Sequence, residues 1–320
     1  MVEGKSSTNF IRGILYLSPA IILLGIFTFY PLINTFIISF KEDYNYMTGE
    51  YSGFGFGNYS LIFNPNNPFR KYLFNTMIIV FISVPLSIIL SLLIAVALNS
   101  VKSLQKVFQT IFFLPYVTNT IAIGMVFSVM FESNQGLINA IIRMFGGTGI
   151  NWLGGNNDYP WLFEFTKNNA IFNAQYWTSL IVLLVYITWN SLPFKILILL
   201  SALQSVDKQY YQAAQIDGTS KIRTFMKVTV PLLSPQIFYL LITSYIGAFK
   251  EYTSVVAIFG KNAESVGQRR NMATVVWYIY DKLKEGGDAG AASAGAVILF
   301  LIIMFFTAIN KYVSKKRVFY

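Results

Sequence analysis

The ionisable residues that stand inside apolar sequence are the first candidates for chemistry. Lys250 and Glu251 follow one another within the apolar stretch 236–259. A charged group that faces hydrocarbon costs at least about 2.5 kcal/mol on insertion scales. Both side chains are therefore expected to face other helices or a wet cavity, with one lining a pathway and the other packing against a partner. A purely structural pair, neutralised by backbone groups, is the alternative.

The chain contains no cysteine and no histidine. This composition excludes thiol nucleophiles, disulfides, Cys/His zinc sites and the commonest general base. An intramembrane enzyme would have to use Glu251, or the pair Asp281 and Glu285. That class is disfavoured because acid–base catalysis needs two positioned groups, and the outer acidic residues alternate with Lys282 and Lys284. No GxxxxGK[ST] phosphate loop occurs, so the chain cannot bind ATP in that manner.

Polar residues near Glu251 have the chemistry of a sugar site. Carboxylate, amide and hydroxyl groups pair with sugar hydroxyls, and aromatic rings cover the apolar side of a pyranose. Trp189 and Phe194 add rings to this neighbourhood, although aromatic residues in spans are more often packing or interface anchors. The substrate-binding residues that we predict from stretches 176–203 and 236–259 are Tyr186, Asn190, Ser191, Ser244, Gly247, Ala248 and Glu251.

The elements that position these residues are membrane helices. The 320 residues are 55% hydrophobic and 12% charged, which is typical of a membrane protein rather than of a soluble domain. The charge of +10 is scattered between apolar runs, which disfavours nucleic-acid binding. Stretches that can cross about 30 Å of hydrocarbon are residues 11–40, 72–99, 107–131, 176–203, 236–259 and 291–313. The sequence thus predicts an all-α protein with six spans, the first retained rather than cleaved as a signal peptide.

Six spans place both termini on one side of the membrane. Twelve Lys and Arg residues fall on that side and ten on the other, and the first set lies in shorter loops. Because positive residues in short loops favour the cytoplasmic side, residues 1–10 and 314–320 are predicted to be cytoplasmic. The chain is accordingly expected in the cell membrane as a multi-pass protein in contact with lipid.

A polar segment, residues 206–235, separates the fourth and fifth stretches and then faces the cytoplasm. Asp207 can cap a helix that runs to Ile216, and Asp217-Gly218 can end it. Thr219 or Ser220 can cap a second helix, in which apolar residues recur at three- and four-residue spacing, and prolines close the segment. These residues are Ile222, Phe225, Met226 and Thr229, then Pro231 and Pro235. Ala213 and Ala214, beside Tyr210 and Tyr211, would suit close docking of another backbone; a helix lying in the headgroups is the alternative.

The same segment resembles a known family motif. YQAAQIDGTSKIRTFMKVTVPLL is similar to the cytoplasmic loop of binding-protein-dependent ABC importer permeases. The matching positions are Gln212, Ala213, Ala214, Gly218, Val228, Val230 and Pro231. Positions that further resemble the maltose and glycerol-phosphate branch are Tyr211, Ile216, Asp217, Phe225, Leu232 and Leu233. YLSPAIILLGIFTFYPLINTFIISF, FFLPYVTNTIAIGMVF, GLINAI and GAASAGAVILFLI extend the resemblance to the first of two paired permeases.

The resemblance implies a type I ABC importer permease that passes a sugar. Its pocket would draw residues from the two stretches named above, with Ser244, Gly247, Ala248 and Glu251 at pocket-lining positions. The residues that would couple to an ATPase are Tyr211, Gln212, Ala213, Ala214, Asp217 and Gly218. The implied partners are a second homologous permease, two copies of a cytoplasmic ATPase that hold ATP and Mg, and an extracellular binding protein that meets the outer loop 132–175. This chain itself would hold no cofactor. Gln212 replaces the family's glutamate, but an exposed ion pair contributes only about 0–1 kcal/mol.

An ion-coupled transporter or channel is the rival class. Lys250 and Glu251 would then form its relay, internal repeats would be expected, and no docking loop would be needed. Two other features have structural interpretations. Trp152 and Trp161 of the outer loop can anchor at headgroups, and the small residues of segment 290–296, GAASAGA, can pack closely against another helix.

Overall fold

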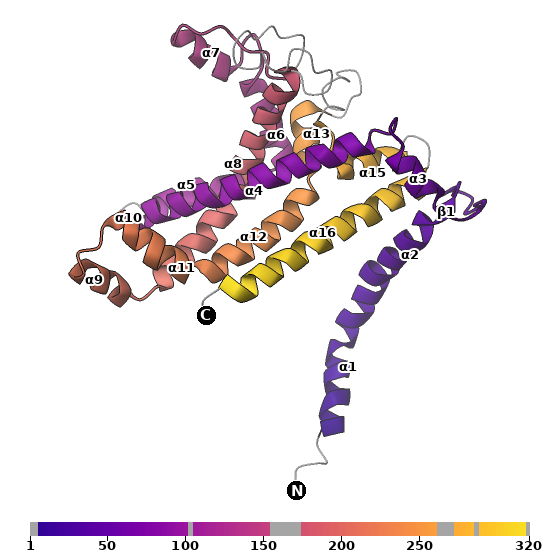
Figure 1. The fold of residues 1–320 in the computed structure, drawn as a ribbon, viewed down its shortest axis with the longest axis horizontal. Helices are drawn as coiled ribbons and strands as arrows, with labels where there is room; N and C mark the ends of the chain where they lie inside the picture. Colours follow the sequence, from indigo (N-terminus) through magenta and orange to yellow (C-terminus); the bar gives the residue numbers. More distant parts are fainter. Residues whose placement is uncertain (1–5, 102–104, 154–173, 261–271, 285–287, 318–320) are drawn as a thin grey trace. The chain divides into compact units, whose positions relative to one another are not determined.

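A computed structural model describes residues 6–101, 105–153, 174–260, 272–284 and 288–317. These residues are mainly helical (Figure 1). They belong to two compact units, one within residues 1–70 and 278–300 and the other within residues 71–277 and 301–320. Trp161, Glu285, the start of the N-terminal segment, the end of the C-terminal tail and half of the outer loop lie outside the described residues.

The first unit contains a long N-terminal helix and a small hairpin. The helix runs continuously through α1 (Ser6–Leu24), the π-helical η1 (Gly25–Phe29) and α2 (Tyr30–Ser39). Strand β1 (Lys41–Glu42) pairs antiparallel with β2 (Gly53–Phe54), and α3 (Gly57–Phe63) follows. The unit also takes the last part of α15 (Val275–Lys284) and the first part of α16 (Ala289–Arg317).

A buried asparagine organises the first unit. The Asn58 amide donates to the carbonyls of Ser39 at 3.1 Å and Lys41 at 2.8 Å, which ties α3 to the end of α2. A Cβ atom added at Gly290 would come within 2.7 Å of that amide. The small residues at the start of α16 therefore allow a close approach, as their composition predicts.

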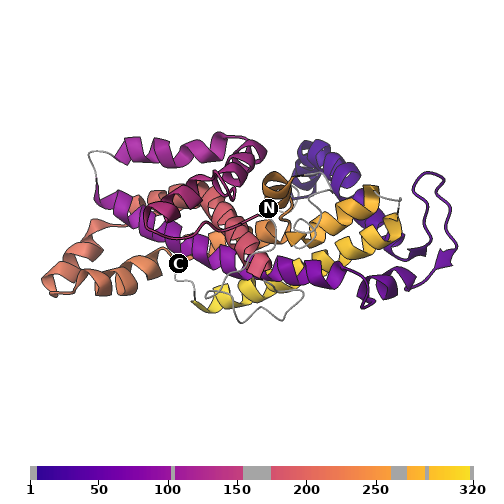
Figure 2. The same ribbon diagram turned by 90° about the horizontal axis from the view of Figure 1, so that it is seen from above.

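The second unit contains the remaining helices. Its first four are α4 (Phe69–Ser100), α5 (Gln105–Val117), α6 (Thr120–Met130) and α7 (Leu137–Met144). Then follow α8 (Ala174–Ser205), α9 (Lys208–Ile216), α10 (Lys221–Thr224), η3 (Phe225–Thr229), α11 (Val230–Leu232), α12 (Ser234–Phe249) and α13 (Thr253–Phe259). Helices α9 and α10 project at one end of this unit in both views (Figures 1 and 2), and Figure 1 shows them away from α6 and α7.

One predicted span is bent, and a second bend lies just before the predicted fifth span. Four described helices are long and apolar enough to cross a membrane, and the count rises to six if each bent pair forms one span. The third apolar stretch turns by 104° between α5 and α6, and residues 221–232 turn by 68° into α12. The side chain of Asn119 accepts from the amides of Ile121 and Ala122 and so starts α6 as a new helix. The bend thus has a local cause, since N-capping satisfies the amides that the turn sets free.

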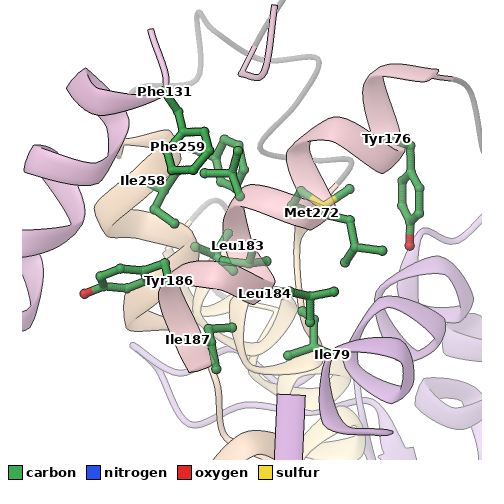
Figure 3. Packing of buried hydrophobic residues seen from close by; sticks show 13 residues of the cluster. Ile79, Phe131, Tyr176, Leu183, Leu184, Tyr186, Ile187, Ile258, Phe259 and Met272 are labelled. Atoms are coloured by element: carbon green, nitrogen blue, oxygen red, sulfur yellow. The ribbon is translucent and has the colours of Figure 1, made fainter. Parts of the chain in front are cut away.

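The core of the second unit is centred on α8. Buried side chains of α8 meet those of α4, α6 and α13, among them Ile79, Leu183, Tyr186 and Ile258 (Figure 3). Helices α6 and α13 approach most closely at Gly124, where an added Cβ would overlap the Ala257 side chain. Small side chains let two backbones approach in this way.

Replacing Gly124 by valine should destabilise the packing of α6 against α13. Overpacking of a close contact costs about 1–3 kcal/mol, so the purified protein should unfold at a lower temperature. Gly25→Val is the matched control, because an added Cβ at Gly25 meets nothing within 4 Å. Equal melting temperatures for the two variants would contradict the contact.

Candidate functional site

The predicted fifth span breaks where its charged pair lies. Helix α12 ends at Phe249, the backbone of Tyr252 is non-helical with φ −141° and ψ −46°, and α13 begins at Thr253. The sequence predicts one continuous helix through Lys250 and Glu251. The structure differs, because these two residues lie between α12 and α13. The Glu251 carboxylate accepts from the free amide of Ser254 at 2.9 Å. A local acceptor thus satisfies one of the amides that the break exposes.

A second segment fixes the backbone at the break. The Thr274 hydroxyl donates to the Glu251 carbonyl at 2.6 Å. The neighbouring amide of Val275 donates to the Thr76 hydroxyl of α4 at 3.0 Å. Residues 274 and 275 therefore tie the backbone of the break to α4.

A polar cavity of about 360 Å³ opens beside the break. It takes its walls from α4, α5, α8, α12 and the start of α13. The lining residues are Ser83, Val84, Ser87, Tyr116, Ile187, Asn190, Ser191, Phe194, Lys195, Thr243, Ser244, Gly247, Ala248, Glu251 and Ser254. Six of the seven predicted substrate-binding residues, all except Tyr186, thus come together in one cavity.

Tyr186 lies in the hydrophobic cluster rather than in the cavity. Its side chain is fully buried, its hydroxyl donates to the Thr120 carbonyl at 2.6 Å, and its ring packs edge-on against Phe127. Tyr186 and Asn190 are four residues apart in α8, so they lie on the same face of that helix. The bend between α5 and α6 covers the Tyr186 end of that face, which no single-helix pattern indicates.

Lys195 is the residue that the sequence reasoning missed. It is 6% exposed, and its ammonium donates to the hydroxyls of Ser87 at 2.5 Å and Ser191 at 3.1 Å. The available signal was an ionisable residue in an apolar stretch, four positions after a predicted site residue.

Lys250 and Glu251 have different environments. Lys250 is exposed at the end of α12 and does not line the cavity, whereas Glu251 does. A proton or ion relay that uses both Lys250 and Glu251 is therefore disfavoured, because the two side chains do not line the same cavity. Of the acidic pair considered for enzyme chemistry, Asp281 lies on α15 and Glu285 lies outside the described residues. Within the described ranges no group of three acidic side chains could hold a metal ion.

The loop after α8 forms two capped helices. The Asp207 side chain accepts from the Gln209 amide at 2.9 Å and begins α9. Gly218 has φ +64°, with hydrogen bonds from its own amide to the Gln215 carbonyl and from the Thr219 amide to the Ala214 carbonyl. This is the Schellman arrangement that ends helices at a left-handed glycine. Ser220, one of the two candidates, caps α10.

Exposure divides the predicted docking residues. Ala214 is buried at 8% exposure, and Tyr211 is half-buried with its hydroxyl 3.4 Å from that of Thr229. The expectation that both alanines lie on an exposed helix face is wrong for Ala214. The exposed predicted residues are Gln212, Ala213, Asp217 and Gly218.

The second helix of this loop also differs from the prediction. Ile222 and Met226 are 79% and 59% exposed, whereas Thr229 is buried. The residues of the predicted apolar face therefore do not share one environment: Ile222 and Met226 are exposed, and Thr229 is buried. Together with Ile216 on α9, at 86% exposure, Ile222 and Met226 leave apolar surface on the loop that no described residue covers.

The described part of the outer loop is ordered by Asn139. This fully buried amide donates to the carbonyls of Ser133 and Ile150 and accepts from the Trp152 indole. Trp152 also packs edge-on against Phe131 and so contacts the buried cluster. The amides of Gln135 and Asn134 donate to the Glu132 carboxylate and lower its pKa.

Comparisons with known proteins agree with this geometry. The family model described as binding-protein-dependent transport system inner membrane component matches residues 87–318. The arabinooligosaccharides transport system permease protein AraP of Bacillus subtilis is 30% identical over 92% of this chain and 86% of its own length. The trehalose/maltose transport system permease protein MalF of Thermococcus litoralis is 27% identical over 95% and 94%.

The fold is also found in a solved transporter. A chain of a bacterial ABC transporter involved in the import of the acidic polysaccharide alginate superimposes with a TM-score of 0.75, at 18% identity, covering 97% of this chain and 96% of that one. A likeness at this identity shows a shared fold. Because the family model covers well over half of the sequence, this chain belongs to the inner membrane components of binding-protein-dependent transport systems, the permeases of ABC importers.

Proposed function

We propose that this permease passes a sugar or oligosaccharide that an extracellular binding protein delivers. The observation that carries the proposal is the cavity, in which one carboxylate, one ammonium, hydroxyls, an amide and two aromatic rings converge within a membrane bundle. The rings of Tyr116 and Phe194 stack at 5.9 Å and form one wall. Mixed polar and aromatic walls suit sugars. The relatives named for arabinooligosaccharides and for trehalose and maltose support the same class.

The cytoplasmic loop is proposed to couple this chain to a separate ATPase. In support, α9 presents Gln212, Ala213 and Asp217 on its exposed side, and Ile216 and Ile222 leave uncovered apolar surface beside them. Exposed apolar side chains on an ordered element are typical of interaction sites. Gln212 would contribute an amide hydrogen bond where the family pattern has a carboxylate.

The remaining partners follow from the family. The importer would combine this chain, as the first of two paired permeases, with a second homologous permease and two ATPase copies that hold ATP and Mg. Both termini would lie in the cytoplasm of a cell-membrane protein, which puts the loop on the same side as the ATPase. The outer loop ordered by Asn139 would then face the binding protein.

Gly218→Val should release the ATPase from the complex. A side chain in the left-handed conformation costs about 1–2 kcal/mol, so the turn between α9 and α10 would open and the docking surface would change shape. Co-purification of the ATPase subunit with the tagged permease measures this loss. Gly146→Val is matched, because Gly146 also has positive φ, +80°, and open space around it, but lies in the outer loop. Retention of the ATPase by Gly218→Val would argue against the docking role.

Substitutions at Gly247 should block sugar passage in proportion to size. An added Cβ at Gly247 meets nothing within 4 Å, and the residue lines the cavity. In the series Gly247→Ala, Gly247→Val and Gly247→Leu, uptake by the reconstituted complex should fall stepwise, by about tenfold or more for leucine. Assembly with the ATPase should not change. Unchanged uptake by Gly247→Leu would place the sugar pathway elsewhere.

A further inference from the structure

Two oppositely charged side chains line the cavity without pairing with each other. Lys195 enters from α8, and Glu251 enters from the break between α12 and α13. Within the described residues no ion pair joins Lys195 to Glu251, whereas Lys282 and Asp288 pair at 3.7 Å. Separate buried charges are costly unless each has partners, so the neutral groups around them matter.

Both charged groups are held by neutral partners and keep unused capacity. The Lys195 ammonium has three donors, of which the hydroxyls of Ser87 and Ser191 take two. The Glu251 carboxylate accepts from the Ser254 amide, with the Ser254 hydroxyl and the Tyr252 amide as further donors. A carboxylate has about four lone-pair sites. One N–H donor of Lys195 and at least one acceptor site of Glu251 thus remain for a ligand in the cavity.

The charge balance of the cavity limits what that ligand can be. The ammonium and the carboxylate together contribute no net charge, and the other lining side chains are neutral. A sugar hydroxyl can donate to Glu251, while a hydroxyl or ring oxygen accepts from Lys195, with no change in net charge. An acidic sugar would bring a second negative charge beside Glu251, and net charge in a low-dielectric cavity is expensive.

We propose that Lys195 and Glu251 form two poles of a site for uncharged sugars and that Glu251 excludes sugar acids. The inference rests on the proposed function and specifies its substrate class. Ser83, Thr243 and Ser244 add hydroxyls that bind either kind of sugar, so the discrimination lies with the two charged residues. Lys195 contributes affinity, and Glu251 contributes the selection against acids.

The absence of native cysteine makes occupancy of this cavity measurable apart from transport. Ser244→Cys introduces the sole thiol of this chain into the cavity wall. The rate at which a maleimide labels this thiol in the reconstituted complex is then measured against increasing sugar. The probes are maltose, trehalose and lactose, each compared with its own singly oxidised uronic acid.

Neutral sugars should protect the thiol of the otherwise unchanged protein at concentrations about tenfold lower than their acids. Glu251→Gln keeps the side-chain shape and should remove this difference, so that each acid protects the thiol at the same concentration as its neutral sugar, whatever the change in the neutral sugar's own affinity. Lys195→Met should raise the protecting concentration of the neutral sugar about tenfold, and Lys195→Arg should restore most of the affinity. Melting temperatures and ATPase co-purification establish that each variant is folded and assembled.

Distinct results would overturn the inference and the proposed function. If neutral sugars protect, but Glu251→Gln leaves the ratio of acidic to neutral protection unchanged, the poles are wrong and the sugar function stands. If Lys195→Met lowers only the melting temperature, Lys195 is a structural tie between α8 and α4 and not a pole. If no sugar protects the thiol or is taken up, the proposed function fails as well.

Discussion

A helix that breaks inside a membrane must find internal partners for every backbone group that the break sets free. At residues 250–252 the partners come from the break itself and from a segment distant in sequence. The Glu251 carboxylate accepts a hydrogen bond from the Ser254 amide, and the Thr274 hydroxyl donates to the Glu251 carbonyl. Asn75 and Thr76 of α4 hold the backbone on either side of Thr274. The contacts that satisfy the break therefore also fix the carboxylate at the wall of the cavity.

The bend between α5 and α6 solves the same problem on the facing side. Asn119 satisfies the first amides of α6, and the Thr120 carbonyl accepts from the buried hydroxyl of Tyr186. The two short helices that follow the breaks, α6 and α13, then meet at Gly124 and Ala257, where a Cβ atom added at Gly124 would overlap the Ala257 side chain. Polar residues at the breaks and small residues beyond them thus belong to one arrangement. This arrangement packs the hydrophobic cluster around α8 and leaves the polar cavity beside the break at residues 250–252.

Features with local causes could be predicted from the sequence. The start and end of α9 follow from Asp207 and Gly218, and Ser244 and Gly247 share a face through helical spacing within α12. Features that depend on distant partners could not. Lys195 takes its role from Ser87, 108 residues earlier, and Tyr211 of α9 meets Thr229, 18 residues later. The two helix breaks were not predicted, because the apolar composition continues through them. Asn119 is nevertheless a recognisable N-cap residue.

Helix α12 connects the two parts of the molecule that the proposed function needs. It begins at Ser234, directly after the loop helices, and it carries Ser244, Gly247 and Ala248 of the cavity wall toward its other end. Sixteen helical residues span about 24 Å, and hydrogen bonds within the helix keep that length fixed. In the proposed function, a displacement of the loop would be passed to the cavity wall as movement of this one element, and the chain would yield at the break at residues 250–252. Rigid secondary elements can carry energetic coupling between two sites, and α12 joins the loop to the cavity wall.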